Sequence, residues 1–175
     1  MKLLLTSILL SLVSADQIFA PSNVRVRELQ DDHHSHRDTA VIETIETDKA
    51  PAAIGPYSQA KKVTGGTTIY VAGQIALNAD GEMVGGGDIS GETEQVFANA
   101  GAILEASGAT FGDVVKTTVL LADINDFAAM NEVYASVFEP SGNKPARSTF
   151  AAKDLPKGVQ VEIEFIAQIS STPQE

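Results

Sequence analysis

Residues 159–167 read VQVEIEFIA, and their alternation is the clearest fold signal in the chain. Apolar side chains occupy every second position from Val159 to Ala167, while Glu162 and Glu164 fall between them. Successive side chains of a β-strand point to opposite faces of its sheet, so this pattern predicts a strand with one apolar face and one mostly polar face. The strand therefore belongs to a sheet that buries one side in a core.

The segments before this strand predict five more strands and two helices. The run VVKTTVLLA at 114–122 is apolar on both faces, which is typical of a central strand. Helical spacing of Val96, Ala100, Ile103 and Leu104 predicts the first helix. The expected strands are 40–46, 58–63, 67–75, 114–122, 146–152 and 159–168, and the expected helices are 90–107 and 124–138.

The ends of both helices carry capping signals. Ser90 is the expected N-cap of the first helix, and Gly108 stands where a C-terminal glycine cap belongs. Asp123 is the expected cap of the second helix, whose inward positions are Phe127, Met130, Val133, Tyr134 and Val137.

The element order β-β-β-α-β-α-β-β predicts an α+β domain with a mixed six-stranded sheet. Two helices are enough to cover one face of such a sheet. The other face then needs a partner, and association between subunits is the usual solution.

The composition excludes several kinds of chemistry. The chain has 175 residues, 23 of them acidic and 12 basic, and a formal net charge of −11. Such a chain is a poor candidate for nucleic-acid binding, which requires Lys and Arg to neutralise phosphates. The absence of Cys excludes disulfides, thiolate nucleophiles and zinc–thiolate sites. Histidine occurs only at His33, His34 and His36, so a domain beginning after them is expected to need neither His-based catalysis nor a His-ligated metal.

The N-terminal segment reads as a targeting sequence. Residues 1–15, MKLLLTSILLSLVSA, have a positive start, an apolar run too short to span a membrane, and small residues before a cleavage point. They predict a signal peptide for the secretory or export pathway; the alternative is an apolar helix. Residues 16–40 are expected to be a disordered linker or targeting segment, and Phe19-Ala20-Pro21 leaves open a two-step leader for a plastid or other organelle. After signal removal no membrane association is expected.

Arg147 is the most informative polar residue of the predicted domain. It is the only arginine after Arg37, and it lies at the start of a predicted strand. A guanidinium presents a rigid fork that matches a carboxylate with two parallel hydrogen bonds. One interpretation is therefore an anchor for a small carboxylate substrate. The alternative is a structural ion pair with Glu162 or Glu164.

Two further groups are candidates for the same site. A carboxylate such as Glu162 or Glu164 beside a bound anion is pushed towards protonation, which suits acid–base catalysis. The alternative is two solvated acids on an exposed face. Tyr57, which follows Gly55-Pro56, either presents its phenol to a pocket or packs as an ordinary tyrosine.

Several motifs together resemble the RidA family, also called YjgF/YER057c/UK114. The resemblance covers about residues 41–170, with the motifs in the family's order and spacing, and leaves residues 171–175 as a C-terminal tail. The motifs are APAAIGPYSQA at 50–60, IYVAGQIAL at 69–77, DVVKTTVLL at 113–121, NDFAAMNEVY at 125–134, PARS at 145–148 and VEIEFIA at 161–167.

The resemblance implies a chorismate-mutase-like α+β fold assembled as a homotrimer, with sites in the clefts between subunits. It implies hydrolytic deamination of 2-iminobutanoate and 2-iminopropanoate to 2-oxo acids and ammonia, without cofactor or metal. The family's carboxylate-binding arginine falls on Arg147, its water-orienting glutamate on Glu162, its site tyrosine on Tyr57, and its glycine with a ligand-facing amide on Gly73. An asparagine of the helix motif falls on Asn131 and is expected to give structural support.

Two positions depart from the family pattern. The deaminases commonly have Ser before Gly-Gln, where this chain has Ala72, and Cys two places after the arginine, where it has Thr149. Thr149 can substitute if the Cys acts through its backbone carbonyl. Ala72 favours the alternative of a non-catalytic, small-carboxylate-binding or chaperone-like trimer, whereas Arg147 and Glu162 favour the enzyme. A nuclease ranks below both because the domain is acidic.

Overall fold

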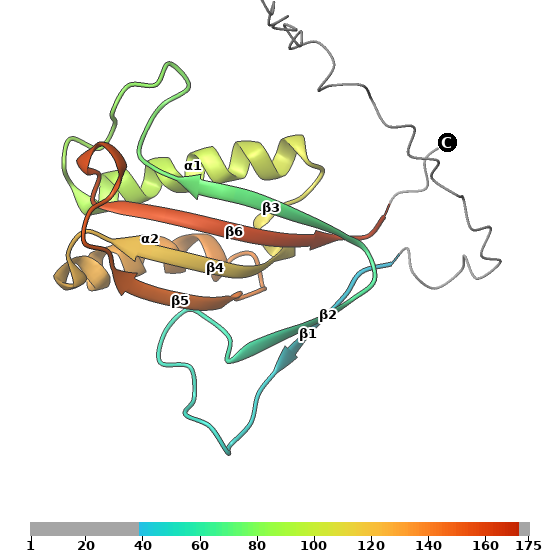
Figure 1. The fold of residues 1–175 in the computed structure, drawn as a ribbon. Coiled ribbons are helices and arrows are strands. Elements are labelled where there is room, and N and C mark those ends of the chain that lie inside the picture. The colour runs from blue at the N-terminus through green and yellow to red at the C-terminus, as the bar shows by residue number, and fades with distance from the viewer. Residues whose placement is uncertain (1–38, 172–175) are drawn as a thin grey trace, which may run out of the picture. The chain divides into compact units, whose positions relative to one another are not determined.

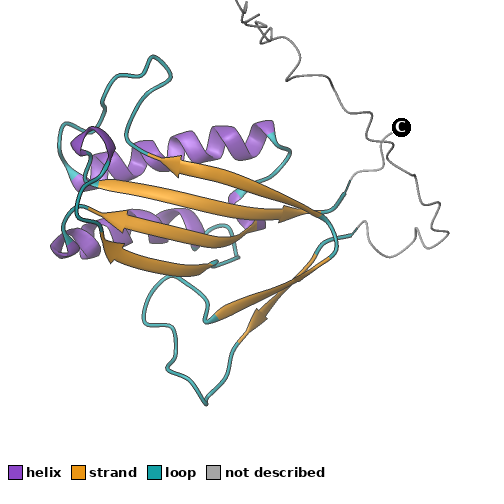
Figure 2. Cartoon of the chain, viewed as in Figure 1, coloured by secondary structure: helices purple, strands orange, loops and turns teal. Residues whose placement is uncertain are grey.

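The computed structural model describes residues 39–171, and its elements follow the predicted order (Figures 1 and 2). The predicted signal peptide, almost all of the predicted linker and most of the C-terminal tail lie outside the described residues. The strands are β1 (Val41–Ile45), β2 (Ala60–Thr64), β3 (Thr67–Gln74), β4 (Val114–Leu121), β5 (Ala146–Ala151) and β6 (Val161–Ile169). The helices are α1 (Ile89–Ala106) and α2 (Phe127–Phe138), with 3-10 turns η2 (Phe111–Asp113), η3 (Ile124–Asp126) and η4 (Pro156–Gly158).

The six strands form two sheets, so the prediction of one six-stranded sheet is wrong. Four strands make a mixed sheet in the order β3-β6-β4-β5, in which only β4 and β5 run parallel. Strands β1 and β2 form a separate antiparallel pair. A single bridge between Ser58 and Ala146 joins the segment before β2 to β5. Alternation along a strand gives its two faces but not its neighbours, which is why the sequence did not show this division.

The turn between β2 and β3 separates the two sheets. Gly65 and Gly66 both have positive φ, at 70° and 76°. A Cβ on Gly66 would lie 2.3 Å from the carbonyl oxygen of Ile169, so this position has no room for a side chain. The chain therefore redirects here, and β3 pairs with β6 instead of β2.

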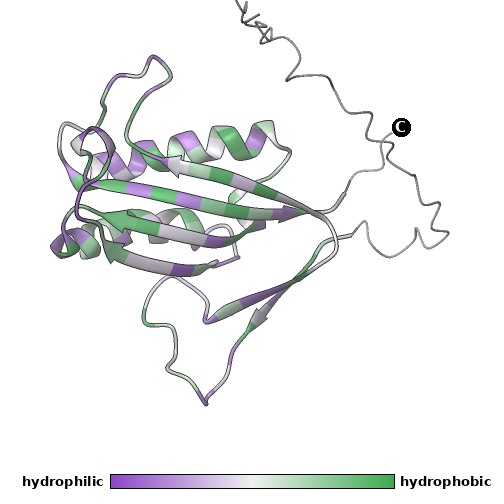
Figure 3. Cartoon of the chain, in the orientation of Figure 1, coloured by the Kyte–Doolittle hydropathy of each residue, from purple (hydrophilic) through white to green (hydrophobic). Residues whose placement is uncertain are grey.

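Both helices lie on one face of the four-stranded sheet, as the sequence predicts (Figure 1). The alternation of polar and apolar residues along β6 is visible in its colours (Figure 3). Val161, Ile163 and Phe165 are buried in the core beneath the helices, and Glu162 and Glu164 point to the opposite face. Phe97 of α1 lies at the centre of the core and makes edge-to-face contacts with four rings, those of Phe111, Tyr134, Phe138 and Phe165.

The face of the sheet away from the helices carries exposed aromatic side chains. Tyr70 of β3 is 78% exposed and Phe150 of β5 is 50% exposed. Both alternate with residues that face the core. No helix in residues 39–171 combines the length and apolarity that a membrane crossing requires.

Three sequence predictions about the helices are wrong: the N-cap of α1, the element that Asp123 caps, and the inward position of Ile103. Asp88, not Ser90, is the N-cap of α1, because its backbone is extended and its carboxylate accepts a hydrogen bond from the Gly91 amide at 2.9 Å. Asp123 caps η3, one turn before α2 begins. Ile103, predicted to face inward, is 36% exposed because it lies at the edge of the apolar stripe. Gly108 follows α1 with φ of 74°, as a C-terminal glycine should.

The two candidate caps give a matched pair of variants. We expect Asp88→Ala to lower the free energy of unfolding by about 1 kcal/mol, since an amide at the start of α1 loses its acceptor. Ser90→Ala should change it by less than about 0.5 kcal/mol. Urea denaturation at one fixed protein concentration measures both. Equal losses in the two variants would contradict this assignment of the cap.

Candidate functional site

Arg147 extends from β5 towards the helices. Its Cα partner on β4 is Thr117, and paired residues of neighbouring strands share a face. Thr117 is fully buried, and its hydroxyl lies 2.7 Å from the hydroxyl of Tyr134 on α2. The strand register therefore places the guanidinium beside α2, on the covered face of the sheet.

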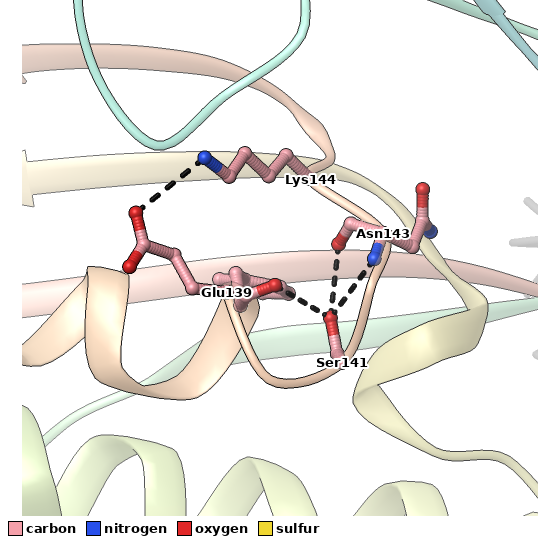
Figure 4. A network of polar contacts seen from close by, with 5 residues as sticks. Glu139, Ser141, Asn143 and Lys144 are labelled. Carbon is pink, nitrogen blue, oxygen red and sulfur yellow. Dashed lines mark hydrogen bonds and ion pairs between the residues drawn. The ribbon is translucent and has the colours of Figure 1, made fainter.

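A hydrogen-bonded turn between α2 and β5 fixes that register (Figure 4). The Ser141 hydroxyl donates to the carbonyl of Phe138 at 2.8 Å and accepts from the Asn143 amide at 3.3 Å. The Asn143 side-chain amide donates to the carbonyl of Val114 at 2.9 Å, which ties the turn to the start of β4. An exposed ion pair between Lys144 and Glu139, at 3.4 Å, closes the turn.

The loop before β2 brings Tyr57 to the same place. The Ser58 amide donates to the carbonyl of Pro145 at 3.0 Å, and its hydroxyl donates to the carbonyl of Lys144 at 2.5 Å. These bonds hold the loop against the segment that leads into β5. As a result, Tyr57 packs on Arg147, and Gly55 lies so near that a Cβ there would be 3.4 Å from the Arg147 Nη2 atom.

Three aromatic rings surround the guanidinium. The Cζ atom of Arg147 lies 4.5 Å from the ring centroid of Tyr134, 5.2 Å from that of Tyr57 and 5.5 Å from that of Phe127. Each distance is within the range of a cation–π contact. No carboxylate in residues 39–171 forms an ion pair with Arg147, so the predicted alternative of a pair with Glu162 or Glu164 is wrong.

Burial disfavours the charged forms of both Arg147 and Tyr134, so it shifts their pKa values in opposite directions. It lowers the pKa of Arg147 by disfavouring the cation, while the adjacent Tyr134 and Tyr57 oppose this effect. Burial raises the pKa of Tyr134 to about 12, although its hydrogen bond to Thr117 and the nearby Arg147 act the other way. The site thus holds a half-buried cation beside neutral rings.

Three buried polar side-chain atoms lack hydrogen-bond partners within the described residues. One is Nη1 of Arg147 itself, and the others are Asn131 Oδ1 and Thr149 Oγ1. Thr149 lies two residues after Arg147 and therefore on the same face of β5. Asn131 lies between Phe127 and Tyr134 on one face of α2, at helical positions i, i+4 and i+7. Buried polar groups are nearly always paired, so this cluster indicates a place that a ligand or another chain completes.

Glu162 and Gly73 meet on the other face of the sheet. Glu162 pairs with Leu120 of β4 and alternates with the buried Val161 and Ile163. A Cβ on Gly73 would lie 1.9 Å from Oε1 of Glu162, so only glycine leaves the carboxylate in its observed position. The groove that Gly73 borders has a volume of about 370 Å³ and runs between the end of β3 and Ile103 of α1.

The six predicted site residues therefore form two groups that do not meet within one chain. The guanidinium half-site comprises Arg147, Tyr57, Asn131 and Thr149, together with Phe127 and Tyr134. The carboxylate half-site comprises Glu162 and Gly73. The two half-sites lie on opposite faces of the same sheet, and strand β4 separates β5 from β6.

Sequence reasoning missed the roles of Phe127 and Tyr134, which it predicted only as core positions. Phe127 is 37% exposed, and Tyr134 is fully buried. The available signal was the helical spacing that places both on one face of α2 with Asn131, a polar residue within an apolar stripe. No group of three or more potential metal ligands occurs in the part of the chain that the structure describes.

Comparisons with known proteins agree on one family. The family described as endoribonuclease L-PSP matches residues 47–169. A mouse (Mus musculus) protein named 2-iminobutanoate/2-iminopropanoate deaminase is 51% identical over 73% of this chain and 91% of its own length. The human (Homo sapiens) protein of that name is 51% identical over 70% of this chain and 87% of its own length. A crystal structure of the Rid family protein YyfB from Yersinia pestis is 31% identical, has a TM-score of 0.67, and covers 73% of this chain and 98% of its own.

The Arg147 cation, which forms no ion pair among residues 39–171, gives a prediction about stability. Replacing a buried charge by an apolar side chain of similar size is often stabilising, so we expect Arg147→Met to raise the free energy of unfolding by about 1 kcal/mol. Lys62→Met is the control, because Lys62 forms only an exposed ion pair with Glu43 and should change stability by less than about 0.5 kcal/mol. Urea denaturation measures both variants. A large loss of stability in Arg147→Met would show that the guanidinium is instead a structural element.

Proposed function

Because the chain belongs to the endoribonuclease L-PSP family, which includes the Rid proteins, we propose that it hydrolyses 2-iminobutanoate and 2-iminopropanoate. The mouse and human proteins named 2-iminobutanoate/2-iminopropanoate deaminase are about half identical to this chain over most of their own length. The products are 2-oxobutanoate or pyruvate, and ammonia.

The observation that carries the proposal is a half-buried guanidinium that has no anionic partner within residues 39–171. Tyr57, Phe127 and Tyr134 contact Arg147 but leave its charge unneutralised. A small carboxylate is the ligand that a guanidinium binds best, through two parallel hydrogen bonds. Asn131 and Thr149 supply further unpaired polar atoms at the same place.

Each proposed step uses groups of this chain. Arg147 binds the carboxylate of the imino acid and fixes the C=N carbon in place. Glu162 orients a water molecule, accepts a proton from it as its oxygen adds to that carbon, and passes the proton to the imine nitrogen, which gives a carbinolamine. Glu162 then accepts the proton of the carbinolamine hydroxyl and passes it to the amine nitrogen. The C=O bond forms as the C–N bond breaks, and the products are ammonia and the 2-oxo acid. Tyr57 closes the pocket beside the guanidinium.

We propose that the complete site forms between copies of the chain in a homotrimer. Arg147 and Glu162 lie on opposite faces of one sheet, so the guanidinium half-site of one copy must meet the carboxylate half-site of the next. The exposed Tyr70 and Phe150 support association through the face without helices.

We do not extend the family's endoribonuclease description to this chain. A net charge of −11 opposes the approach of a polyanion. Within residues 39–171, Arg147 is the only arginine, and aromatic rings pack around it. A small imino acid fits these features better than a nucleic acid.

Mixing two inactive variants tests both the activity and the shared site. We expect Arg147→Ala and Glu162→Gln to be folded but each to lose at least about 100-fold in hydrolysis of freshly generated 2-iminobutanoate. After the two are unfolded together and refolded as a 1:1 mixture, about a quarter of wild-type activity should return, because one site in four then combines both intact residues.

Different results of this experiment would contradict the shared site and the catalytic activity. A mixture as inactive as its components would contradict a site built from two copies. A wild-type protein that binds 2-oxobutanoate in a titration, yet does not accelerate imine hydrolysis, would favour the non-catalytic binding protein. Subunit mass measured by light scattering should be unchanged in both variants, which is the control for assembly.

The contact between Gly73 and Glu162 yields a second activity prediction. Gly73→Ala should lower kcat for 2-iminobutanoate by about 10-fold or more, because the new methyl group displaces the carboxylate that orients water. Stability should change little, since the displaced group is the end of a flexible side chain. Gly81→Ala controls for removal of a glycine, because its Cβ would meet nothing within 4 Å, although its φ of 80° adds strain. A kcat equal to wild type in Gly73→Ala would exclude Glu162 from the reaction.

A further inference from the structure

Tyr134 makes the shortest of the three ring contacts to Arg147. Its ring centroid lies 4.5 Å from Cζ, against 5.2 Å for Tyr57 and 5.5 Å for Phe127. It is also fully buried, whereas Phe127 is 37% exposed and Tyr57 belongs to a loop. Tyr134 is therefore the most firmly held surface against which the guanidinium rests.

Two sets of contacts fix the Tyr134 ring. Its hydroxyl lies 2.7 Å from the hydroxyl of Thr117, which is itself fully buried and paired with Arg147 across the β4–β5 ladder. Its ring packs against Phe138 at 4.6 Å and Phe97 at 5.7 Å. The strand residue beside Arg147 thus anchors the ring that the guanidinium contacts.

We propose that Tyr134 is the positioning residue of the guanidinium half-site: its ring, held by the packing of the core, sets the orientation of Arg147 for carboxylate binding. This inference rests on the proposed function only in naming a 2-oxo or 2-imino acid as the ligand. The orientation itself is a property of the chain.

The physical reason is that a ring stabilises a cation without neutralising it. A glutamate beside Arg147 would occupy the hydrogen-bonding edge of the guanidinium and compete with the substrate carboxylate. An aromatic face attracts the cation through its quadrupole, and this attraction grows when water is excluded. The guanidinium thereby keeps its charge and its donors for the ligand.

The first test reads the orientation directly and needs no substrate. With three rings within 5.5 Å of Cζ, we expect ring currents to shift the Nε–H resonance of Arg147, which is identified in a ¹H–¹⁵N spectrum by its loss in Arg147→Lys. We expect Tyr134→Phe to keep this shifted position and Tyr134→Leu to move it towards the value of a solvated arginine. An unmoved resonance in Tyr134→Leu would overturn the inference.

The second test measures the effect on the ligand. Tyr134→Leu should weaken binding of 2-oxobutanoate in a calorimetric titration, and raise KM for 2-iminobutanoate, by about 10-fold or more with a smaller effect on kcat. Tyr134→Phe should restore Kd and KM to within about threefold of wild type. Failure of Tyr134→Phe to restore binding would show that the hydroxyl, not the ring, carries the effect, and would overturn the inference.

Phe165→Leu is the control for lost packing. Phe165 is buried in the same core and contacts Phe97 and Phe111, but it makes no ring contact with Tyr134 and no cation–π contact with Arg147. It should lower stability while leaving Kd unchanged; an equal loss of affinity in Phe165→Leu would contradict a specific role for Tyr134. If Tyr134→Leu does not fold, Tyr134→Met, whose flexible chain fills irregular space, takes its place with the same expected result.

The two tests separate this inference from the proposed function. A wild-type chain that binds 2-oxobutanoate but does not hydrolyse 2-iminobutanoate refutes the function. The spectrum and the Kd values would still support or overturn the role of Tyr134.

Discussion

The candidate site depends on one constraint: aromatic rings hold a positive charge that no carboxylate of the described part of the chain neutralises. Taking a guanidinium partly out of water is unfavourable, and burial accordingly lowers the pKa of Arg147. The rings of Tyr57, Phe127 and Tyr134 offset that penalty in a way that leaves the hydrogen-bonding edge free. A protein built only for stability would place an acid or an apolar residue there.

The rest of the fold serves to hold these rings in place. The core around Phe97 packs α1 and α2 on the sheet, and this packing sets the height of Tyr134 above β5. The turn through Ser141 and Asn143 fixes where β5 begins, and therefore which residue of β4 lies beside Arg147. Small displacements in either place would move the guanidinium, because close-packed interiors transmit changes in shape.

The sheet also explains why the proposed site needs two copies of the chain. Side chains alternate across a strand, so β5 directs Arg147 to the covered face while β6 directs Glu162 to the open one. No change of rotamer brings the two through the sheet. The proposed assembly resolves this separation, and it also covers the aromatic residues that the open face exposes.

The sequence alone determined the order of the elements, the two faces of β6, the central position of β4, and the candidates Arg147, Tyr57 and the pair Glu162 and Glu164. The family resemblance then favoured Glu162 and added Gly73. Periodicity and motif spacing are local properties, and they can be read without knowing the neighbours of a strand. Only the tertiary structure decided that β1 and β2 leave the main sheet, that rings and not acids surround Arg147, and that Glu162 lies on the opposite face. These facts depend on which strands pair, in which register, and against which helix face, and such contacts join residues that are far apart in the chain.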